Sequence, residues 1–269
     1  MFSDHALHCR LERAEAVANA GFVDARARLE PASGAQWIEV AGAYAMYDGP
    51  RSPCTQTFGL GLFAMPTTAD IERIETLFKE HGAPVFHELS PIAAKSLLPM
   101  LKERHYQPIE FTTVMYMTLA DKGFAKPSGK DGLQVRVVEK PEHELWAKTV
   151  AEGWREFAEI ADLMLDLGRV TAARKESACF LVDLYGRPIA AGALALHDRI
   201  ALLAGASTLP EWRRRGAQSA LLETRLRYAA QAGCDLAMMC AEPGSASQRN
   251  AERQGFRIAY TRIKFALAS

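Results

Sequence analysis

The sequence lacks the features that mark several large classes of protein. Its 269 residues contain five cysteines, an odd number, with no CxxC pair and no zinc-like spacing of cysteine and histidine. This pattern argues against a disulfide framework and a metal site, so we expect buried thiols in a reducing compartment. No apolar run approaches the ~20 residues that span a bilayer, and no basic stretch followed by an apolar one opens the chain. We therefore expect a cytoplasmic protein with no membrane partner.

Net charge is also absent. The chain has 32 lysines and arginines against 32 aspartates and glutamates, so its formal charge is zero. This balance argues against general binding to nucleic acid or to an anionic membrane. Hydrophobic residues make up 49% of the chain, which is ordinary for a globular protein, and the length accommodates two domains. Basic character is local, and its strongest concentration is the run of three arginines at 213–215.

These arginines and Gly216 stand at the junction between a predicted strand and a predicted helix. The strand is the apolar run 199–209, and the helix has apolar residues three and four apart before it ends near Gly233. The first turn of a helix leaves about four N–H groups unpaired, and its dipole adds positive potential. Three exposed cations oppose that dipole by roughly 0.3–1 kcal/mol each, unless an anion binds there. The junction predicts a phosphate site, with merely solvated charges as the alternative.

The junction resembles the acyl-CoA-binding motif of the GNAT acyltransferase superfamily, Pro-x-x-Arg-x-x-Gly-x-(Gly/Ala) before a leucine-rich helix. Pro210, Arg213 and Gly216 match that order, whereas Gln218 stands where the family usually has glycine or alanine. Downstream, a predicted strand and a short helix that ends in Gly-Phe resemble the next elements of the family. The resemblance covers roughly residues 132–269 and implies acetyl-CoA as co-substrate.

The resemblance also implies which residues bind this co-substrate. The end of the strand would hold the pantetheine and the thioester carbonyl, and the N–H groups of 214–219 would hold the pyrophosphate. The residues expected to bind acetyl-CoA are Thr208, Leu209, Arg213, Arg214, Arg215, Gly216, Ala217, Gln218, Ser219 and Asn250.

The catalytic acid and base are less clearly indicated. Many family members have a tyrosine four residues before the glycine of Gly-Phe, but this chain has Ala251 there. Glu242 could deprotonate an amine directly or through water. Ser247 and Asn250 could contact the thiol or the pantetheine, although serine and asparagine also cap helices. Tyr260 is a candidate proton donor whose alternative role is packing in the core.

The acceptor is expected in a groove beside this site. Trp146, Trp154 and the segment 158–175 are its expected walls, and Glu159 and Asp162 are alternative bases there. No residue of the groove carries a substrate-specific signature.

The chain is predicted to divide into a domain at 1–120, a linker at 121–132 rich in glycine, proline and alternating charge, and a domain at 133–269. We expect an α/β (α+β, GNAT-like) fold with a mixed central sheet flanked by helices, in two such halves. The first half repeats the strand–helix–strand–helix–strand order of 200–265, over 57–63, 69–80, 84–89, 92–105 and 109–118.

We interpret this repetition as a tandem GNAT protein whose first copy is degenerate and binds no CoA; the alternative is a generic α/β cap domain. Gly59 and Gly61 lie inside an apolar run, where glycine indicates a bulge or close packing.

The resemblance therefore implies an N-acyltransferase that moves an acetyl group from acetyl-CoA to a primary amine of a small or amino-acid-like acceptor by direct attack. A strong acid is not essential, because a thiolate whose thiol has a pKa of ~8.5 is a fair leaving group. The alternative is a non-catalytic acyl-CoA-binding sensor. A nucleotide-binding P-loop is less favoured, because the loop lacks Gly-Lys-(Ser/Thr). The oligomeric state, monomer or homodimer, stays open.

Overall fold

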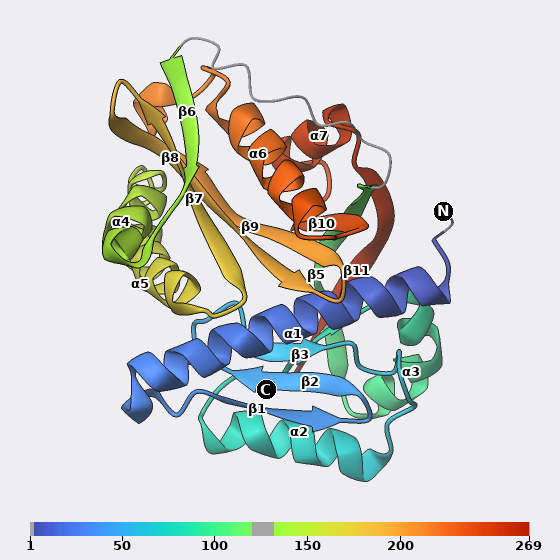
Figure 1. The fold of residues 1–269 in the computed structure, drawn as a ribbon. Helices are drawn as coiled ribbons and strands as arrows, with labels where there is room; N and C mark the ends of the chain where they lie inside the picture. Colours follow the sequence, from blue (N-terminus) through green and yellow to red (C-terminus); the bar gives the residue numbers. More distant parts are fainter. Residues whose placement is uncertain (1–2, 120–131, 269) are drawn as a thin grey trace. The chain divides into compact units, whose positions relative to one another are not determined.

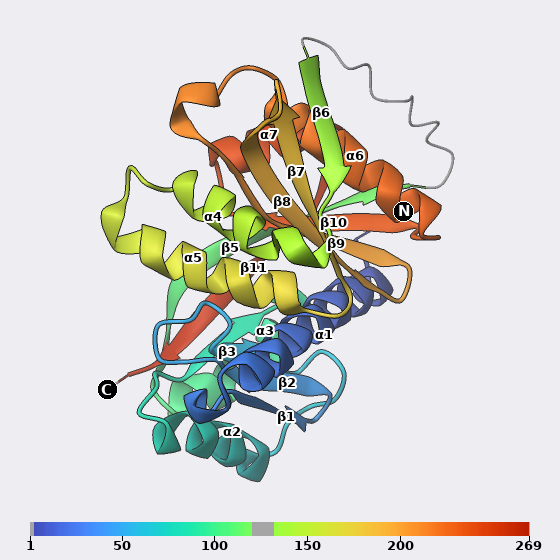
Figure 2. The same ribbon diagram turned by 60° about the vertical axis from the view of Figure 1, so that its left-hand side comes forward.

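The computed structural model describes residues 3–119 and 132–268, and the chain divides into two compact units. Unit 1 comprises Met1–Met117 and Met238–Ser269, and unit 2 comprises Thr118–Ala237. Each unit has helices packed on a β-sheet (Figures 1 and 2). The predicted α/β class, with mixed sheet and flanking helices, is confirmed. None of the described helices is both long enough and apolar enough to span a membrane.

Unit 1 holds a mixed sheet in which β3 and β4 are parallel, whereas the pairs β1–β2, β2–β3, β4–β11 and β5–β11 are antiparallel. Its strand order is β1-β2-β3-β4-β11-β5-β10. The strands are β1 (Gln36–Val40), β2 (Ala43–Tyr47), β3 (Gln56–Phe58), β4 (Phe86–Leu89), β5 (Tyr106–Thr118), β10 (Leu236–Ala241, which begins at the unit boundary) and β11 (Arg257–Leu267). The helices are α1 (His5–Leu29), η1 (Pro31–Ser33), α2 (Thr68–Glu80), α3 (Pro91–Glu103) and α7 (Ala246–Arg253).

The alternation of side chains along β2 gives unit 1 its two layers of core. Met46 points to the face that α1 covers, where it packs with Val23 and Phe58. Tyr47 and its neighbours on the other face pack with α2, whose Ile71, Ile74 and Phe78 are three and four residues apart and so share one side of the helix.

The last strand of the chain, β11, lies in the middle of this sheet. It pairs antiparallel with both β4 and β5, so that Ile263 is opposite Leu89 on one side and Phe111 on the other. Residues 238–269 consequently group with the first part of the chain and not with the rest of the predicted domain 133–269. The predicted linker 121–132, except its last residue, lies outside the described residues.

The predicted order of elements in the first half is present as β3, α2, β4, α3 and β5. The strand expected at 57–63 is shorter, because Gly59 and Gly61 adopt left-handed φ angles of 76° and 73° and the N–H of Leu62 donates to the carbonyl of Gly59 in a turn. Close packing at Gly61 is confirmed, since a Cβ there would lie 2.5 Å from Cδ1 of Leu97.

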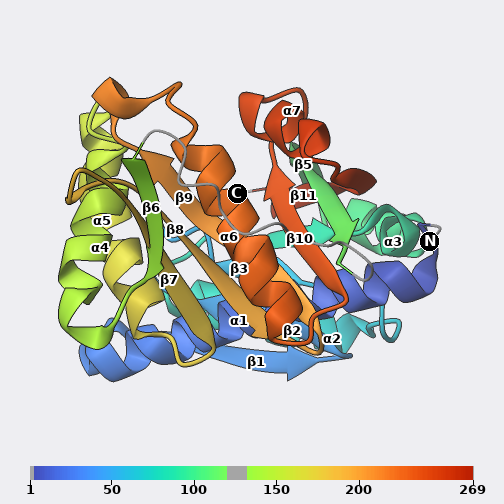
Figure 3. The ribbon, with the colours of Figure 1, turned by 45° about the horizontal axis from the view of Figure 1, so that its top comes forward.

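Unit 2 holds four antiparallel strands in the order β6-β7-β8-β9. In Figure 3, α4 and α5 cover one face of this sheet and α6 covers the other. The strands are β6 (Leu133–Val137), β7 (Ser177–Leu184), β8 (Arg187–His197) and β9 (Ile200–Thr208). The helices are η3 (Lys140–Glu142), α4 (His143–Glu152), α5 (Ala158–Ala173), η4 (Pro210–Trp212) and α6 (Ala217–Gln231).

Candidate active site

The predicted phosphate loop connects β9 to α6 in unit 2. After the single turn of η4, Arg214 adopts a left-handed φ of 63° and Gly216 a φ of 82°. Gly216 is the N-cap of α6, and no side chain caps the helix. Glycine tolerates the left-handed region, whereas an arginine there carries strain. The loop is therefore a sharp turn that leaves the helix N-terminus open.

The open N-terminus presents a row of backbone donors. The first hydrogen bond of α6 runs from the N–H of Ala220 to the carbonyl of Gly216, at 3.0 Å. The N–H groups of 217–219 precede it and have no partner within the helix. In the part of the chain that the structure describes, the N–H groups of 214–216 also have no acceptor. Together with the helix dipole, these donors make an anion-binding site.

The corresponding helix of the first half, α2, is closed by its own side chains. Oγ1 of Thr67 accepts from the N–H of Asp70 at 3.2 Å, and the carboxylate of Asp70 accepts from the N–H of Thr67 at 2.8 Å. This capping box places a resident negative charge where an anionic ligand would have to bind. It supports the expectation that the first half has no phosphate site.

Arg213 does not extend toward these donors. Its Nη2 donates to the carbonyl of Gly153 at 3.0 Å, its Nε to the carbonyl of Thr208 at 3.4 Å, and its Nη1 lies 2.5 Å from Oε2 of Glu156. The guanidinium thus ties the loop to the end of α4. For this one of the three arginines, the structure favours a positional role over direct contact with a phosphate.

Arg214 and Arg215 line a cavity of about 490 Å³ together with Gly216. The guanidinium of Arg215 stacks 4.9 Å from the ring centroid of Trp212. The side chain of Tyr185, 87% exposed, forms part of the opposite wall. A cavity of this size, with cations and an aromatic ring, can accommodate a nucleotide-sized anion.

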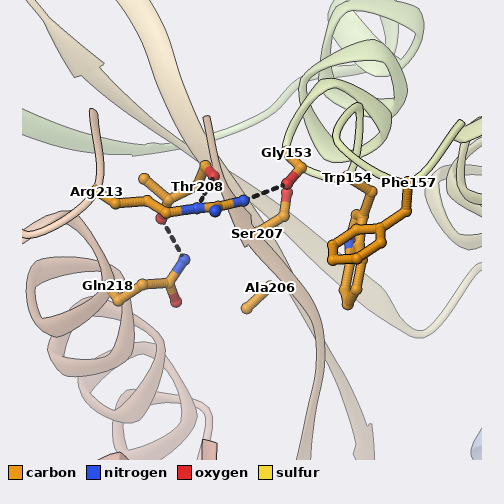
Figure 4. A pocket seen from close by; sticks show the side chains of 8 residues that line it. All are labelled: Gly153, Trp154, Phe157, Ala206, Ser207, Thr208, Arg213 and Gln218. Carbon is orange, nitrogen blue, oxygen red and sulfur yellow. Dashed lines mark hydrogen bonds between the residues drawn. The ribbon is translucent and has the colours of Figure 1, made fainter. Parts of the chain in front are cut away.

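A second cavity, of about 230 Å³, lies between the end of β9, the first turn of α6 and the α4–α5 connection (Figure 4). On its α6 side, Nε2 of Gln218 donates to Oγ1 of Thr208 at 2.7 Å. The lining residues are Gly153, Trp154, Phe157, Ala206, Ser207, Thr208, Arg213 and Gln218.

The end of α4 approaches β9 closely at this cavity. A Cβ on Gly153 would lie 2.6 Å from both Cβ and Oγ of Ser207, so only glycine fits there without a shift. The hydroxyl of Ser207 in turn donates to the carbonyl of Val150 at 3.0 Å. The floor of the cavity is therefore fixed by close packing.

Trp154 and Phe157 face the cavity from the α4–α5 connection, as Figure 4 shows. They are 37% and 54% exposed, which is unusual for large aromatic side chains, and their ring centroids are 6.3 Å apart. Trp146, expected as a third wall, is instead 1% exposed and belongs to the core under α4. The alternative bases Glu159 and Asp162 are exposed on α5.

Other predicted site residues belong to unit 1. Glu242 directly follows β10 and is exposed, and Ser247 and Asn250 are exposed one turn apart on α7. The N-cap of α7 is Ser245, whose Oγ accepts from the N–H of Gln248 at 3.2 Å, so neither Ser247 nor Asn250 is needed as a cap. Ala251, at the position where many family members have tyrosine, is only 2% exposed.

Tyr260 lies in the interior of unit 1. Its hydroxyl donates to Oε1 of Glu12 at 2.8 Å, and its ring stacks on His8 with centroids 3.8 Å apart. Burial raises the pKa of the phenol well above its usual value, and the neighbouring Glu12 carboxylate adds to the rise. These contacts correct the expectation of a proton donor, because the phenol is engaged in the core.

Comparisons with known proteins find a similarity over the part of the chain that contains the loop. Residues 141–256 match the model of the acetyltransferase (GNAT) family. A search of curated proteins found no match. A GCN5-related N-acetyltransferase from Kribbella flavida is 18% identical with a TM-score of 0.64, and the match covers 93% of this chain and 96% of that one.

Two further solved structures are similar in fold. One is a GCN5-related N-acetyltransferase from Sphaerobacter thermophilus (15% identity, TM-score 0.55, 80% and 72% covered). The other is a tandem GNAT protein from the clavulanic acid biosynthesis pathway (12% identity, TM-score 0.52, 75% and 70% covered). Residues 141–256 thus match the GNAT family model, and the chain as a whole shares a tandem GNAT-like fold with these structures.

Proposed function

We propose that the protein is an N-acyltransferase that moves an acetyl group from acetyl-CoA to a primary amine of a small or amino-acid-like acceptor. The observation that carries this proposal is the uncapped N-terminus of α6, where Gly216 turns the chain and the N–H groups of 214–219 lack acceptors among the described residues. The match of 141–256 to the acetyltransferase family supports it.

The donor would bind along the loop and the end of β9. The open N–H groups suit the pyrophosphate, and Arg214 and Arg215 suit the nucleotide end of the donor. The pantetheine and the thioester carbonyl would follow the backbone of Thr208 and Leu209. The side chain of Gln218, which donates to Thr208, leaves the backbone N–H of Gln218 available to the donor.

The reaction requires a free amine. An alkylammonium with a pKa near 10.4 is less than about 0.1% neutral at pH 7, so a base must remove a proton. The amine nitrogen then attacks the thioester carbon, the C–S bond breaks, and the departing thiolate takes up a proton to give CoA and an amide. An N–H group aimed at the developing oxyanion is worth roughly 3–4 kcal/mol.

We propose Glu242 as the base, because its side chain is exposed directly after β10 and forms no ion pair within the described part of the chain. Ser247 and Asn250 are proposed to contact the thiol or pantetheine. Trp154 and Phe157 are proposed to border the acceptor, which leaves Glu159 and Asp162 as alternative bases on the same side.

The second candidate is an acyl-CoA-binding protein without catalysis. The buried Ala251 favours it, because no phenol is available on that helix to protonate a thiolate. Calorimetric titration with acetyl-CoA, followed by assay of thiol release with a panel of primary amines, separates the two. Binding with turnover on at least one amine is expected. Binding without turnover on any amine would favour the sensor, and absence of binding would refute both.

A further inference from the structure

Strand β9 carries a bulge directly before the loop. Ala191 of β8 is opposite Ser207, and Ala193 is opposite Ala204, so two residues of β9, Gly205 and Ala206, are opposite a single residue of β8. Gly205 has a left-handed φ of 60°, as expected in a bulge of this kind. Residues 204–206 are exposed, whereas the rest of β9 is buried.

A buried arginine of α6 holds this bulge. Nη1 of Arg225 donates to the carbonyl of Ala193 at 3.0 Å and to that of Ala204 at 3.4 Å, which joins β8 to β9 at the point where the register shifts. The residue opposite the bulge is Gly192, and a Cβ there would lie 2.9 Å from Cδ2 of Leu221 and 3.2 Å from Nη1 of Arg225. Glycine at 192 therefore makes room for both Leu221 and the guanidinium.

The charge of Arg225 has no partner of opposite sign. Its side chain is 4% exposed, no described carboxylate forms an ion pair with it, and its Nε lacks a hydrogen-bond acceptor. Burial lowers the pKa of this guanidinium to about 10. An uncompensated buried ion costs several kcal/mol, so an apolar side chain of similar size would serve packing better. The two hydrogen bonds to the carbonyls of Ala193 and Ala204 are the interactions that an apolar side chain could not make.

The bulge is also held from the opposite face of the sheet. Nε1 of Trp146, on α4, donates to the carbonyl of Gly192 at 3.3 Å and to that of Phe180 at 3.1 Å. Helices α6 and α4 lie on opposite faces of this sheet (Figure 3). Arg225 therefore contacts the backbone of β8 and β9 from one face, and Trp146 contacts that of β7 and β8 from the other.

We propose that Arg225 is a positioning residue for acyl transfer, which fixes the bulge at 205–206 so that the exposed backbone of β9 meets the acyl donor in one geometry. This inference rests on the proposed function, in which the donor follows β9. A misplacement of about 1 Å at a reacting group can reduce the rate about 100-fold.

The test compares Arg225→Met with Arg227→Met. Arg227 lies on the same helix, two residues after Arg225. Arg227 is partly exposed, pairs at 4.0 Å with Glu223 and forms no hydrogen bond to β9 in the described part of the chain, so it is a matched control. We expect Arg225→Met to keep or raise the melting temperature while kcat/KM for amine acetylation falls at least tenfold. Arg225→Lys, which retains a cation and a donor, should recover part of this loss. Arg227→Met should behave as the wild type.

Amide hydrogen exchange gives a readout that does not need activity. Exchange at 203–207 should be at least tenfold faster in Arg225→Met than in the wild type, and unchanged in Arg227→Met. Unchanged exchange and unchanged kcat/KM in a folded Arg225→Met would overturn the inference. If that variant does not fold, Trp146→Phe, which removes the donor to Gly192, must show the same faster exchange. Wild-type protein that fails to bind acetyl-CoA refutes the proposed function, and exchange still decides the role of Arg225 at the bulge.

Discussion

Gln218 and Thr208 are joined by a hydrogen bond of 2.7 Å, from Nε2 of the amide to Oγ1 of the hydroxyl. The bond links the first turn of α6 to the last residue of β9, and both residues line the smaller of the two cavities. The acyl-CoA motif that the loop resembles has glycine or alanine at this place, and neither residue can make such a contact. The hydrogen bond stabilises the loop without using the backbone N–H of Gln218.

Gln218→Ala is therefore expected to affect stability more than affinity. The free energy of unfolding should fall by about 0.5–1.5 kcal/mol, the usual net value of one hydrogen bond. The Kd for acetyl-CoA should stay within about threefold, because the backbone donors remain. Urea denaturation and calorimetry measure the two quantities. Gln231→Ala, at the exposed other end of α6, is the control, and a tenfold loss of affinity would show that the carboxamide itself contacts the donor.

Gly216 and Gly233 allow a sharper test of the loop. Their φ angles are 82° and 83°, at opposite ends of α6, so alanine introduces similar backbone strain at each. That strain costs roughly 1–2 kcal/mol. We expect both variants to lose comparable stability in denaturant unfolding, whereas only Gly216→Ala loses affinity for acetyl-CoA, by at least tenfold. Equal affinities in the two variants would contradict the phosphate site.

The arginines of the loop are also expected to differ, one contributing to stability and the other to affinity for acetyl-CoA. Arg213 is held by Gly153, Thr208 and Glu156, so Arg213→Ala should lower the melting temperature and change the affinity for acetyl-CoA little. Arg214→Ala removes a cation that lines the nucleotide-sized cavity and should weaken binding by about three- to thirtyfold, more at low salt than at high salt. Calorimetry at two salt concentrations measures the affinities. A large loss of affinity in Arg213→Ala and little loss in Arg214→Ala would exchange the roles assigned to the two residues.

Local patterns in the sequence were sufficient to predict the loop and its helix. The periodic apolar residues after Gly216 and the cap at Gly233 depend on neighbours in the chain, and α6 begins and ends there. The turn of Arg213 toward α4 and the burial of Tyr260 against Glu12 depend on distant residues, which spacing cannot indicate. The same holds for β11, whose place between β4 and β5 is set by pairing across more than half of the chain.

One missed residue did leave a signal. Leu221, Arg225 and Ala229 are four residues apart, so they lie on one side of α6, and all three are buried. A charged residue between two apolar ones on the core-facing side of a helix indicates a buried charge that has a structural or functional role.

The buried cluster around Arg262 in unit 1 predicts a pH-dependent stability. Its guanidinium lies 3.7 Å from Oε2 of Glu12, 2.7 Å from Oε2 of Glu15 and 3.0 Å from Oε2 of Glu88. Oε1 of Glu88 also lies 3.5 Å from Nζ of Lys264, so three carboxylates share two cations. Burial raises the pKa of Glu12 from 4.5 to about 7; Arg262 opposes the rise, and Glu15 and Glu88 add to it. The folded protein therefore holds a proton that the unfolded chain releases between about pH 4.5 and pH 7.

Stability from this group must accordingly fall as the pH rises through that window, by about 3 kcal/mol in total. Glu12→Gln mimics the protonated side chain and should remove the effect. The free energy of unfolding of the variant, relative to that of the wild type, should therefore increase steadily from pH 5 to pH 8. Burial also lowers the pKa of His8 and His87, so these two groups change the stability with pH in the opposite direction. Both histidines are present in the wild type and in the variant, so the difference between the two free energies of unfolding isolates Glu12. Urea denaturation at several pH values measures it, with the exposed Glu39→Gln as control. A constant difference across the range would mean that Glu12 is ionised throughout and fully neutralised by Arg262.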